Sequence, residues 1–301
     1  LLQRLIDQLL EFACKLLEFF RLARFVLVAL RHILLELVQF FEPFVGSGAV
    51  FFDLNTMGRL QNHDAVLIDS NADLIGCYTV VRDRPEEVAE VLEELATGYR
   101  HTGPRHYYEI RDGRFNPLRN QRRTSEGRIR YNPELAAMFI YLNRTGFNGL
   151  FRLNASGAFN VPVGRYTRPS TPSRAHILHI SEALSKPRVS LEYGSFERAA
   201  AVAKAGDFLY IDPPYAPTSR TANFTSYTPA RFDASDQRRL QAMVVSLAQR
   251  GCHVLLSNST AAEITALYDR NSSTRAAGLR ARRVPARRAI NSNGARRGPV
   301  E

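Results

Sequence analysis

The pattern of apolar and polar positions changes near residue 40 of the chain. In residues 1–39, leucine and phenylalanine recur at three- and four-residue spacing, which predicts an amphipathic helical segment. Beyond residue 40, short apolar runs end in turn signals and alternate with helix-compatible stretches. Five runs predict β-strands, at residues 40–45, 65–68, 189–193, 208–211 and 253–256. This alternation predicts an α/β fold with a largely parallel sheet that is covered on both faces.

Residues 83–175 break this alternation and predict an inserted domain. The stretch is rich in arginine, with Arg111, Arg114, Arg119, Arg122, Arg123, Arg128 and Arg130. We interpret it as a mainly helical insert with a positive surface. The α/β domain would then comprise residues 40–82 and 176–301, and residues 1–39 would form a separate Leu-rich segment.

Composition and charge narrow the class of protein. The 301 residues are 45% hydrophobic and 23% charged, which excludes a disordered or collagen-like chain. Forty Lys and Arg against 29 Asp and Glu give a net charge of +11, which favours a polyanionic partner. Charged residues interrupt the apolar runs of residues 1–39 well before the roughly 18 residues that a membrane span needs. We therefore expect neither a membrane partner nor a signal peptide.

The three cysteines predict no metal chemistry. Cys14, Cys77 and Cys252 are far apart and lack the paired spacing with histidine that a zinc site needs. We expect them to be small buried hydrophobic residues in a reduced, intracellular setting, and we expect no metal site.

A glycine turn after the first predicted strand is the first candidate binding feature. Gly46 and Gly48 permit a tight turn and a close approach of the backbone to an adenosine-type ligand. The next predicted strand ends at Asp69, where a carboxylate can bind both ribose hydroxyls of such a ligand. Two other interpretations stay open, because the glycines could form an ordinary turn and Asp69 could be the N-cap of a helix over residues 72–81.

The tetrapeptide Asp212-Pro213-Pro214-Tyr215 follows the predicted strand at residues 208–211. Each proline fixes its own φ angle and biases its predecessor toward extended geometry, so the strand has a rigid exit. Asp212 and the Pro213 carbonyl can both accept hydrogen bonds from one exocyclic amine, and Tyr215 can stack on the ring that carries it. We interpret the tetrapeptide as a clamp for a base, with a plain turn as the alternative.

Seven segments in chain order carry a family resemblance over about residues 41–300. They are residues 42–48, 69–74, 143–152, 159–166, 212–216, 221–227 and 288–294. Together they resemble the Dam-type DNA adenine-N6 methyltransferases of the D12 class, alpha group. The resemblance implies a Rossmann-like class I methyltransferase sheet with a target-recognition insert that carries a β-hairpin. It also implies methyl transfer from S-adenosylmethionine to a flipped adenine in double-stranded DNA, with no metal.

The resemblance also implies roles for residues of the α/β domain. Phe44, Gly46 and Gly48 would line S-adenosylmethionine, Asp69 would hold its ribose, and Asp212 would border it. The catalytic residues would be Asp212, Pro213, Pro214 and Tyr215. By accepting both N6 hydrogens, Asp212 and Pro213 would expose the nitrogen lone pair, and the proton released after transfer could leave toward Asp212 or water.

DNA recognition would fall to the insert. By resemblance, the hairpin spans residues 144–166, Phe147 is the aromatic wedge, and the predicted DNA-binding residues are Arg144, Phe147, Asn148, Leu150, Arg152 and Pro162. An arginine can read guanine O6 and N7 with two bonds, and an aromatic wedge fills the gap left by an extruded base. The implied target is GATC, although Thr145 and Phe147 stand where the family commonly has tyrosine.

Alternative functions stay open at this point. The family begins with a segment that contains Trp and a Gly-Gly-Lys run, and residues 1–39 contain neither. One alternative is therefore a DNA-binding remnant without the cofactor lid and without catalysis. Another is methyl transfer to cytosine N4 or to a protein glutamine, since related tetrapeptides clamp any planar amine or amide. The resemblance implies a cytoplasmic, nucleoid-associated bacterial or phage protein, with a role in DNA methylation or restriction-modification.

Overall fold

A computed structural model of the chain describes residues 38–126, 128–166, 169–217 and 232–284, and the backbone of residues 286–287 and 299–300. Almost all of the helical segment predicted for residues 1–39 lies outside the described residues. Cys14 and the family segments 221–227 and 288–294 also lie outside the described residues.

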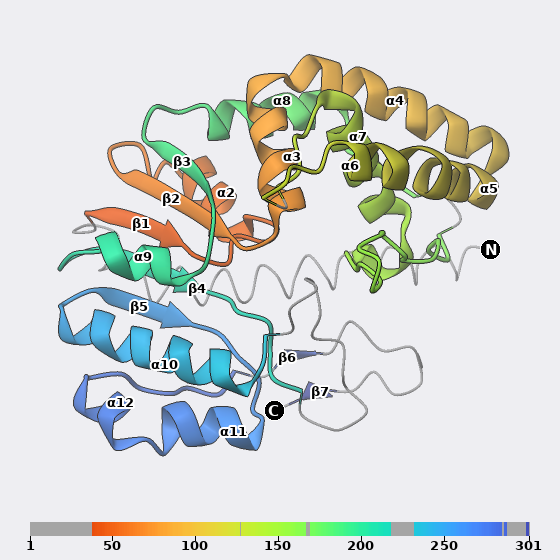
Figure 1. Ribbon diagram of the computed structural model, residues 1–301. Helices are drawn as coiled ribbons and strands as arrows, with labels where there is room; N and C mark the ends of the chain where they lie inside the picture. The colour runs from red at the N-terminus through yellow and green to blue at the C-terminus, as the bar shows by residue number, and fades with distance from the viewer. Residues whose placement is uncertain are drawn as a thin grey trace.

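Five parallel strands form the central sheet, in the order β3-β2-β1-β4-β5 (Figure 1). They are β1 (Gln39–Glu42), β2 (Asp64–Asp69), β3 (Val189–Tyr193), β4 (Phe208–Ile211) and β5 (His253–Leu256). The prediction of a parallel α/β sheet is confirmed, and β3, β4 and β5 have the predicted bounds. The first strand is shorter than predicted and ends at Glu42, because Pro43 has no N–H for a ladder and a turn begins there.

The chain enters the sheet at its centre. β1 pairs with β2 on one side and with β4 on the other, so that Phe40 lies beside both Ala65 and Phe208. From β1 the chain runs outward to β3 and then crosses back to β4 and β5. The carboxyl ends of all five strands therefore lie at one edge, and the direction of winding reverses between β1 and β4. Such a switch point is where open α/β sheets bind their ligands.

Helices cover both faces of this sheet (Figure 1). Alternate residues of a strand face opposite ways, so Phe40 and Phe41 enter different cores. The core on the Phe40 side contains residues of α2 (Ala49–Thr56), α3 (Ala72–Asp83) and α8 (Arg174–Leu184). The core on the Phe41 side contains residues of α9 (Glu197–Val202) and α10 (Ala234–Gln249).

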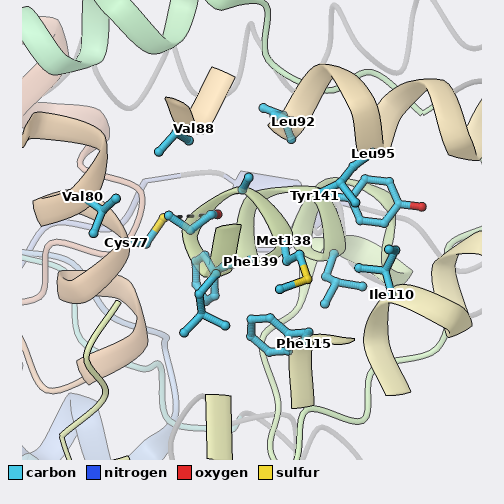
Figure 2. Packing of buried hydrophobic residues seen from close by; sticks show 14 of the residues in the cluster. Cys77, Val80, Val88, Leu92, Leu95, Ile110, Phe115, Met138, Phe139 and Tyr141 are labelled. Carbon is cyan, nitrogen blue, oxygen red and sulfur yellow. Dashed lines mark hydrogen bonds between the residues drawn. The ribbon is translucent and has the colours of Figure 1, made fainter. Parts of the chain in front are cut away.

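A third core lies among the helices between β2 and β3. Besides α3 and α8, these helices are α4 (Pro85–Thr102), α5 (Pro104–Tyr108), the π-helical η2 (Glu109–Phe115), α6 (Asn116–Gln121), α7 (Pro133–Thr145) and the 3-10 turn η3 (Phe147–Gly149). Figure 2 shows Cys77 and Val80 of α3 packed beside Met138 and Phe139 of α7. Cys77 Sγ lies 3.8 Å from the Ala136 carbonyl oxygen. Because buried contacts cross residue 83, the domain division at that residue stays a prediction.

Short elements follow β5. They are α11 (Ala262–Ile264), the π-helical η4 (Thr265–Asp269), α12 (Ser272–Ala276) and an antiparallel pair of β6 (Ala286–Arg287) with β7 (Pro299–Val300). Among the helices that the structure describes, none is long and apolar enough to cross a membrane.

Candidate active site and nucleic-acid interface

Three neighbouring strands end in a carboxylic acid at the same edge of the sheet. β2 ends at Asp69, β1 ends at Glu42, and Asp212 directly follows the end of β4. The charges of Asp69 and Asp212 both act on Glu42, which lies between them. This edge includes the switch point between β1 and β4, so the fold brings two of the predicted site residues together at the expected place for a ligand.

The glycine turn follows β1 directly. Gly46 and Gly48 adopt φ angles of +48° and +64°, in the left-handed region that side chains disfavour. A Cβ atom on Gly48 would lie only 2.8 Å from Cε2 of Phe52, so the turn also needs glycine for space. Gly46 N–H donates to Asp69 Oδ2 at 3.0 Å, and Tyr78 Oη donates to the Gly46 carbonyl at 3.0 Å. The turn is therefore tied to the end of β2.

Asp69 is held by backbone donors on both carboxylate oxygens. Besides the bond from Gly46, Asn71 N–H donates to Asp69 Oδ1 at 2.8 Å. The alternative role of Asp69 as an N-cap is wrong, because the side chain of Asn71 caps α3 and accepts from Asp73 and Leu74 N–H. Burial raises the pKa of Asp69, and the backbone donors offset part of that rise. Gly46, Asn71 and Ser70 are backbone donors to this carboxylate, and the acceptor site that they leave open can take a hydroxyl donor.

Glu42 was not among the predicted site residues. Its side chain is buried, and Oε2 accepts a hydrogen bond of 3.1 Å from Phe51 N–H in α2. Burial raises its pKa well above the usual range, and the charges of Asp212 and Asp69 raise it further. The sequence did contain the signal, since Glu42 is an acid at the end of an apolar strand, like Asp69 and Asp212.

Asp212 accepts a short hydrogen bond of 2.5 Å from Ser257 Oγ, at the end of β5. Burial raises the pKa of Asp212, and hydrogen bonds from the Ser257 and Tyr215 hydroxyls offset part of the rise. Although surrounded by protein, Asp212 keeps an exposed surface, and Tyr215 beside it is 43% exposed. The predicted catalytic carboxylate is therefore fixed in place, accessible and a better proton acceptor than an ordinary aspartate.

A polar network holds the chain that follows Asp212. The Pro214 carbonyl accepts from Gln237 Nε2 of α10 at 3.1 Å, and Gln237 Oε1 accepts from Asn258 Nδ2 at 3.1 Å. Ser259 Oγ donates to the Ala216 carbonyl at 2.7 Å. Sequence reasoning missed Gln237, Asn258 and Ser259, which lie 23 or more positions from the backbone groups that they bind and carry no motif of their own.

Phe44 lies in an aromatic cluster next to the glycine turn. Its ring stacks on Phe196 with 5.3 Å between centroids and meets Phe232 edge-on at 5.6 Å. The cluster presents apolar surface of the kind that suits the face of an aromatic ligand. Phe196 and Phe232 were not predicted, because they come from segments more than 150 residues away from Phe44.

The predicted DNA-binding residues lie on one folded-back segment. Within the described residues 144–166 there is no regular strand, but isolated antiparallel bridges join Gly146 to Val163 and Leu153 to Phe159. We call residues 147–154 the outgoing arm and residues 157–162 the returning arm. Phe147 N–H donates to the Pro162 carbonyl at 2.8 Å, which brings two of the predicted residues together.

The other predicted DNA-binding residues take varied positions. Arg152 is exposed and donates through Nε to Asn160 Oδ1 at 2.8 Å. Asn148 has a positive φ of 54°, and Leu150 is half-buried. Arg144 Nε donates to the Ser170 carbonyl at 3.1 Å, at the opposite end of the segment from Arg152.

Several of the arginines predicted to form a positive surface on the insert are paired with acidic side chains. Arg119 was predicted to lie on that surface, and this is wrong, because it is buried against Asp73 of α3. Arg111 and Arg114 form ion pairs with Asp112 and Glu134. An arginine-rich sequence does not distinguish exposed side chains from those that meet an acid distant in the chain.

Comparison with known proteins points to one family. The family model described as D12 class N6 adenine-specific DNA methyltransferase matches residues 31–281. The chain is 38% identical over 235 residues to the type II methyltransferase M1.LlaDCHI of Lactococcus lactis subsp. cremoris, with 76% of this chain and 75% of that protein covered. It is 34% identical to the type II methyltransferase M.MjaIII of Methanocaldococcus jannaschii (86% and 84% covered). It is 35% identical to the DNA adenine methylase of Escherichia coli strain K12 (86% and 83% covered).

Proposed function

The chain belongs to the D12 class of N6 adenine-specific DNA methyltransferases, and from that premise we propose that it methylates a flipped adenine at N6 within GATC sites of duplex DNA. The methyl donor would be S-adenosylmethionine. The observation that carries this proposal is the meeting of Gly46, Asp69 and Asp212 at the switch-point edge of the sheet.

The residues at this edge suit the methyl donor. Gly46 and Gly48 both have positive φ angles that side chains disfavour, and a Cβ on Gly48 would also meet Phe52. Asp69 keeps an acceptor site for a ribose hydroxyl. Phe44 offers apolar ring surface, and the carboxylates of Asp69 and Asp212 suit a cationic ligand. We therefore assign cofactor binding to Phe44, Gly46, Gly48, Asp69 and Asp212. When bound, S-adenosylmethionine supplies a methyl group that is activated by the sulfonium charge.

The four residues Asp212, Pro213, Pro214 and Tyr215 would perform the chemistry on the base. The Asp212 carboxylate and the Pro213 carbonyl accept the two N6 hydrogens, which turns the nitrogen lone pair toward the methyl group. Tyr215, which is exposed, stacks on the adenine ring. After transfer, the surplus proton on N6 leaves toward Asp212 or water. The raised pKa of Asp212 favours that step, and the hydrogen bond from Ser257 limits the rise.

Recognition of DNA would fall to residues 83–175 as a target-recognition domain, with the folded-back segment acting as its β-hairpin. Phe147 would fill the gap left by the extruded base, and Arg152 would read guanine through the guanidinium edge that Asn160 leaves free. Arg144, Asn148, Leu150 and Pro162 complete the proposed contacts. The name of the Escherichia coli relative, DNA adenine methylase, supports adenine as the acceptor. GATC rests on the family resemblance.

Incubation of the purified chain with labelled S-adenosylmethionine and unmethylated plasmid DNA tests this function. Digestion to nucleosides should yield N6-methyladenine, and sequencing should place it in GATC. Asp212→Ala should abolish incorporation, whereas the exposed acid Glu263 on α11 serves as a control whose Ala variant stays active. N4-methylcytosine as the product, or DNA binding with no methylated base at all, would refute the proposal and favour one of the alternatives.

A further inference from the structure

The returning arm of the folded-back segment is hydrogen-bonded along both of its edges. On the inner edge it pairs with the outgoing arm through alternate residues. Asn160 N–H donates to the Arg152 carbonyl at 3.1 Å, and the Ala158 carbonyl accepts from Asn154 N–H at 2.8 Å. The bond from Phe147 N–H to the Pro162 carbonyl completes this edge.

The outer edge is satisfied by side chains instead of a neighbouring strand. The Asn116 amide accepts from Phe159 N–H at 2.8 Å and donates to the Phe159 carbonyl at 3.0 Å, as a paired backbone residue would. Two residues earlier, the Gly157 carbonyl accepts from Arg119 Nη1 at 2.6 Å. Two residues later, the Val161 carbonyl accepts from both Tyr107 Oη and Arg111 Nη1 at 2.9 Å. These donors follow the two-residue period of an extended strand.

This arrangement fixes which side chains of the arm face outward. Phe159 and Val161 are buried in the core of the insert. Asn160 is half-buried, and Pro162 is exposed. Two arms joined by so few bridges would be marginal on their own, since an isolated pair of strands is hardly stable in water. The outer donors therefore hold the arm, and with it Asn160, which binds Arg152.

The donors on the outer edge are themselves bonded to α3, which packs against the central sheet. Arg119 donates through Nε and Nη2 to the two Asp73 carboxylate oxygens at 2.6 and 2.8 Å, and Tyr131 Oη donates to Asp73 at 2.9 Å. Asp73 lies in the first turn of α3, whose cap Asn71 is bonded to Asp69. A continuous series of hydrogen bonds thus connects Asp69 with the turn of the folded-back segment at Gly157.

We propose that Asn116 and Arg119 are positioning residues for DNA recognition. Their side chains act as a substitute strand that sets the place of the returning arm and, through Asn160, the orientation of Arg152. The inference rests on the proposed function, because it takes Arg152 and Pro162 as the residues that read DNA. Neither Asn116 nor Arg119 touches the base or the methyl donor in this scheme.

Asn116→Ala is the variant that tests whether these side chains position the returning arm. It removes both bonds to Phe159 and leaves the buried pair of Arg119 with Asp73 intact. Tyr131→Phe is the matched control, since it removes one buried hydrogen bond to Asp73 without touching the arm. The substrates are a duplex that contains the site methylated by the wild type and duplexes with one base pair of that site changed. Kinetics, melting temperature and binding by fluorescence anisotropy are measured for each protein.

Asn116→Ala is expected to raise KM for the target duplex and to reduce discrimination against the changed duplexes, each by about fivefold to tenfold, the effect of one or two hydrogen bonds. kcat at saturating DNA and the affinity for S-adenosylmethionine should stay within about twofold. Tyr131→Phe should lower the melting temperature and leave discrimination unchanged.

Unchanged discrimination in Asn116→Ala would overturn the inference, and so would equal loss of discrimination in Tyr131→Phe at a similar melting temperature. Failure of the proposed function would show differently, as absence of methylation by the wild type itself. In that case anisotropy still compares the binding of wild type and variant to a panel of duplexes, and equal binding profiles would overturn the inference.

Discussion

Replacing Ser257 with alanine should move the acid limb of the methylation rate to higher pH. Asp212 must be ionised to accept the N6 hydrogens, so the rate is expected to fall as pH drops through the pKa of this group. That pKa is already raised by burial, and the hydrogen bond from Ser257 lowers it. Removal of the 2.5 Å bond takes away a contribution that lowers the pKa, so the pKa rises further.

The size of this shift follows from the bond that is lost. A hydrogen bond to a charged group contributes about 1.5–3 kcal/mol. Tyr215 remains as a partner of Asp212, and Asp212 is exposed, so we take the lower end of that range, which corresponds to about one pH unit. At pH values below the pKa of Asp212, the methylation rate of Ser257→Ala should be about tenfold lower than that of the wild type. On the alkaline plateau the two rates should agree within about twofold.

The assay is the initial rate of methyl incorporation at saturating DNA and S-adenosylmethionine, measured across the pH range in a buffer of constant ionic strength. Ser259→Ala is the matched control, because Ser259 Oγ donates to the Ala216 carbonyl and not to Asp212. Its acid limb should coincide with that of the wild type. An unshifted limb in Ser257→Ala, or a uniform loss of rate at every pH, would refute the assignment of the limb to Asp212.

Three further predictions concern the glycine turn and the buried charges. Gly48→Ala should weaken S-adenosylmethionine binding by at least about tenfold in calorimetry, because the turn needs a φ of +64° and a Cβ would meet Phe52, and unchanged affinity would contradict the proposed cofactor site. Arg119→Met should lower the free energy of unfolding by about 3–5 kcal/mol in urea titrations, because it leaves Asp73 buried without its cation. The raised pKa of Glu42 means that its contribution to stability is full below the pKa of the unfolded chain and is lost as pH rises through the folded pKa. Glu42→Gln should therefore flatten the decline of stability that begins as pH rises above the pKa of glutamate in the unfolded chain, and an equally steep decline would show that Glu42 is not the group involved.

The sequence predicts the sheet well because its strands are short apolar runs between turn signals. β3, β4 and β5 have the predicted bounds for this reason, and Asp69 and Asp212 lie at strand ends as expected. The burial of Glu42 was not predicted, although Glu42 ends the apolar strand β1 just as Asp69 ends β2. The partners of Arg119 could not be read from the sequence, because Asp73 lies 46 residues away and Gly157 lies 38 residues away. The predicted hairpin is present only as isolated bridges between its two arms, and the side chains that bond to its outer edge come from a distant part of the chain that the sequence does not connect with it.

The charge of the whole chain and the charge at the sheet edge have opposite signs. The chain carries a formal net charge of +11, which attracts the phosphate backbone of DNA. At that edge, Asp69 and Asp212 lie on either side of Glu42, whose raised pKa favours its neutral form, and the two aspartates disfavour an anionic phosphate there. A cationic methyl donor and a neutral base are both tolerated at such an edge. In the proposed function, the electrostatics therefore keep the phosphates of DNA on the basic surface, and only an adenine that has left the double helix reaches Asp212.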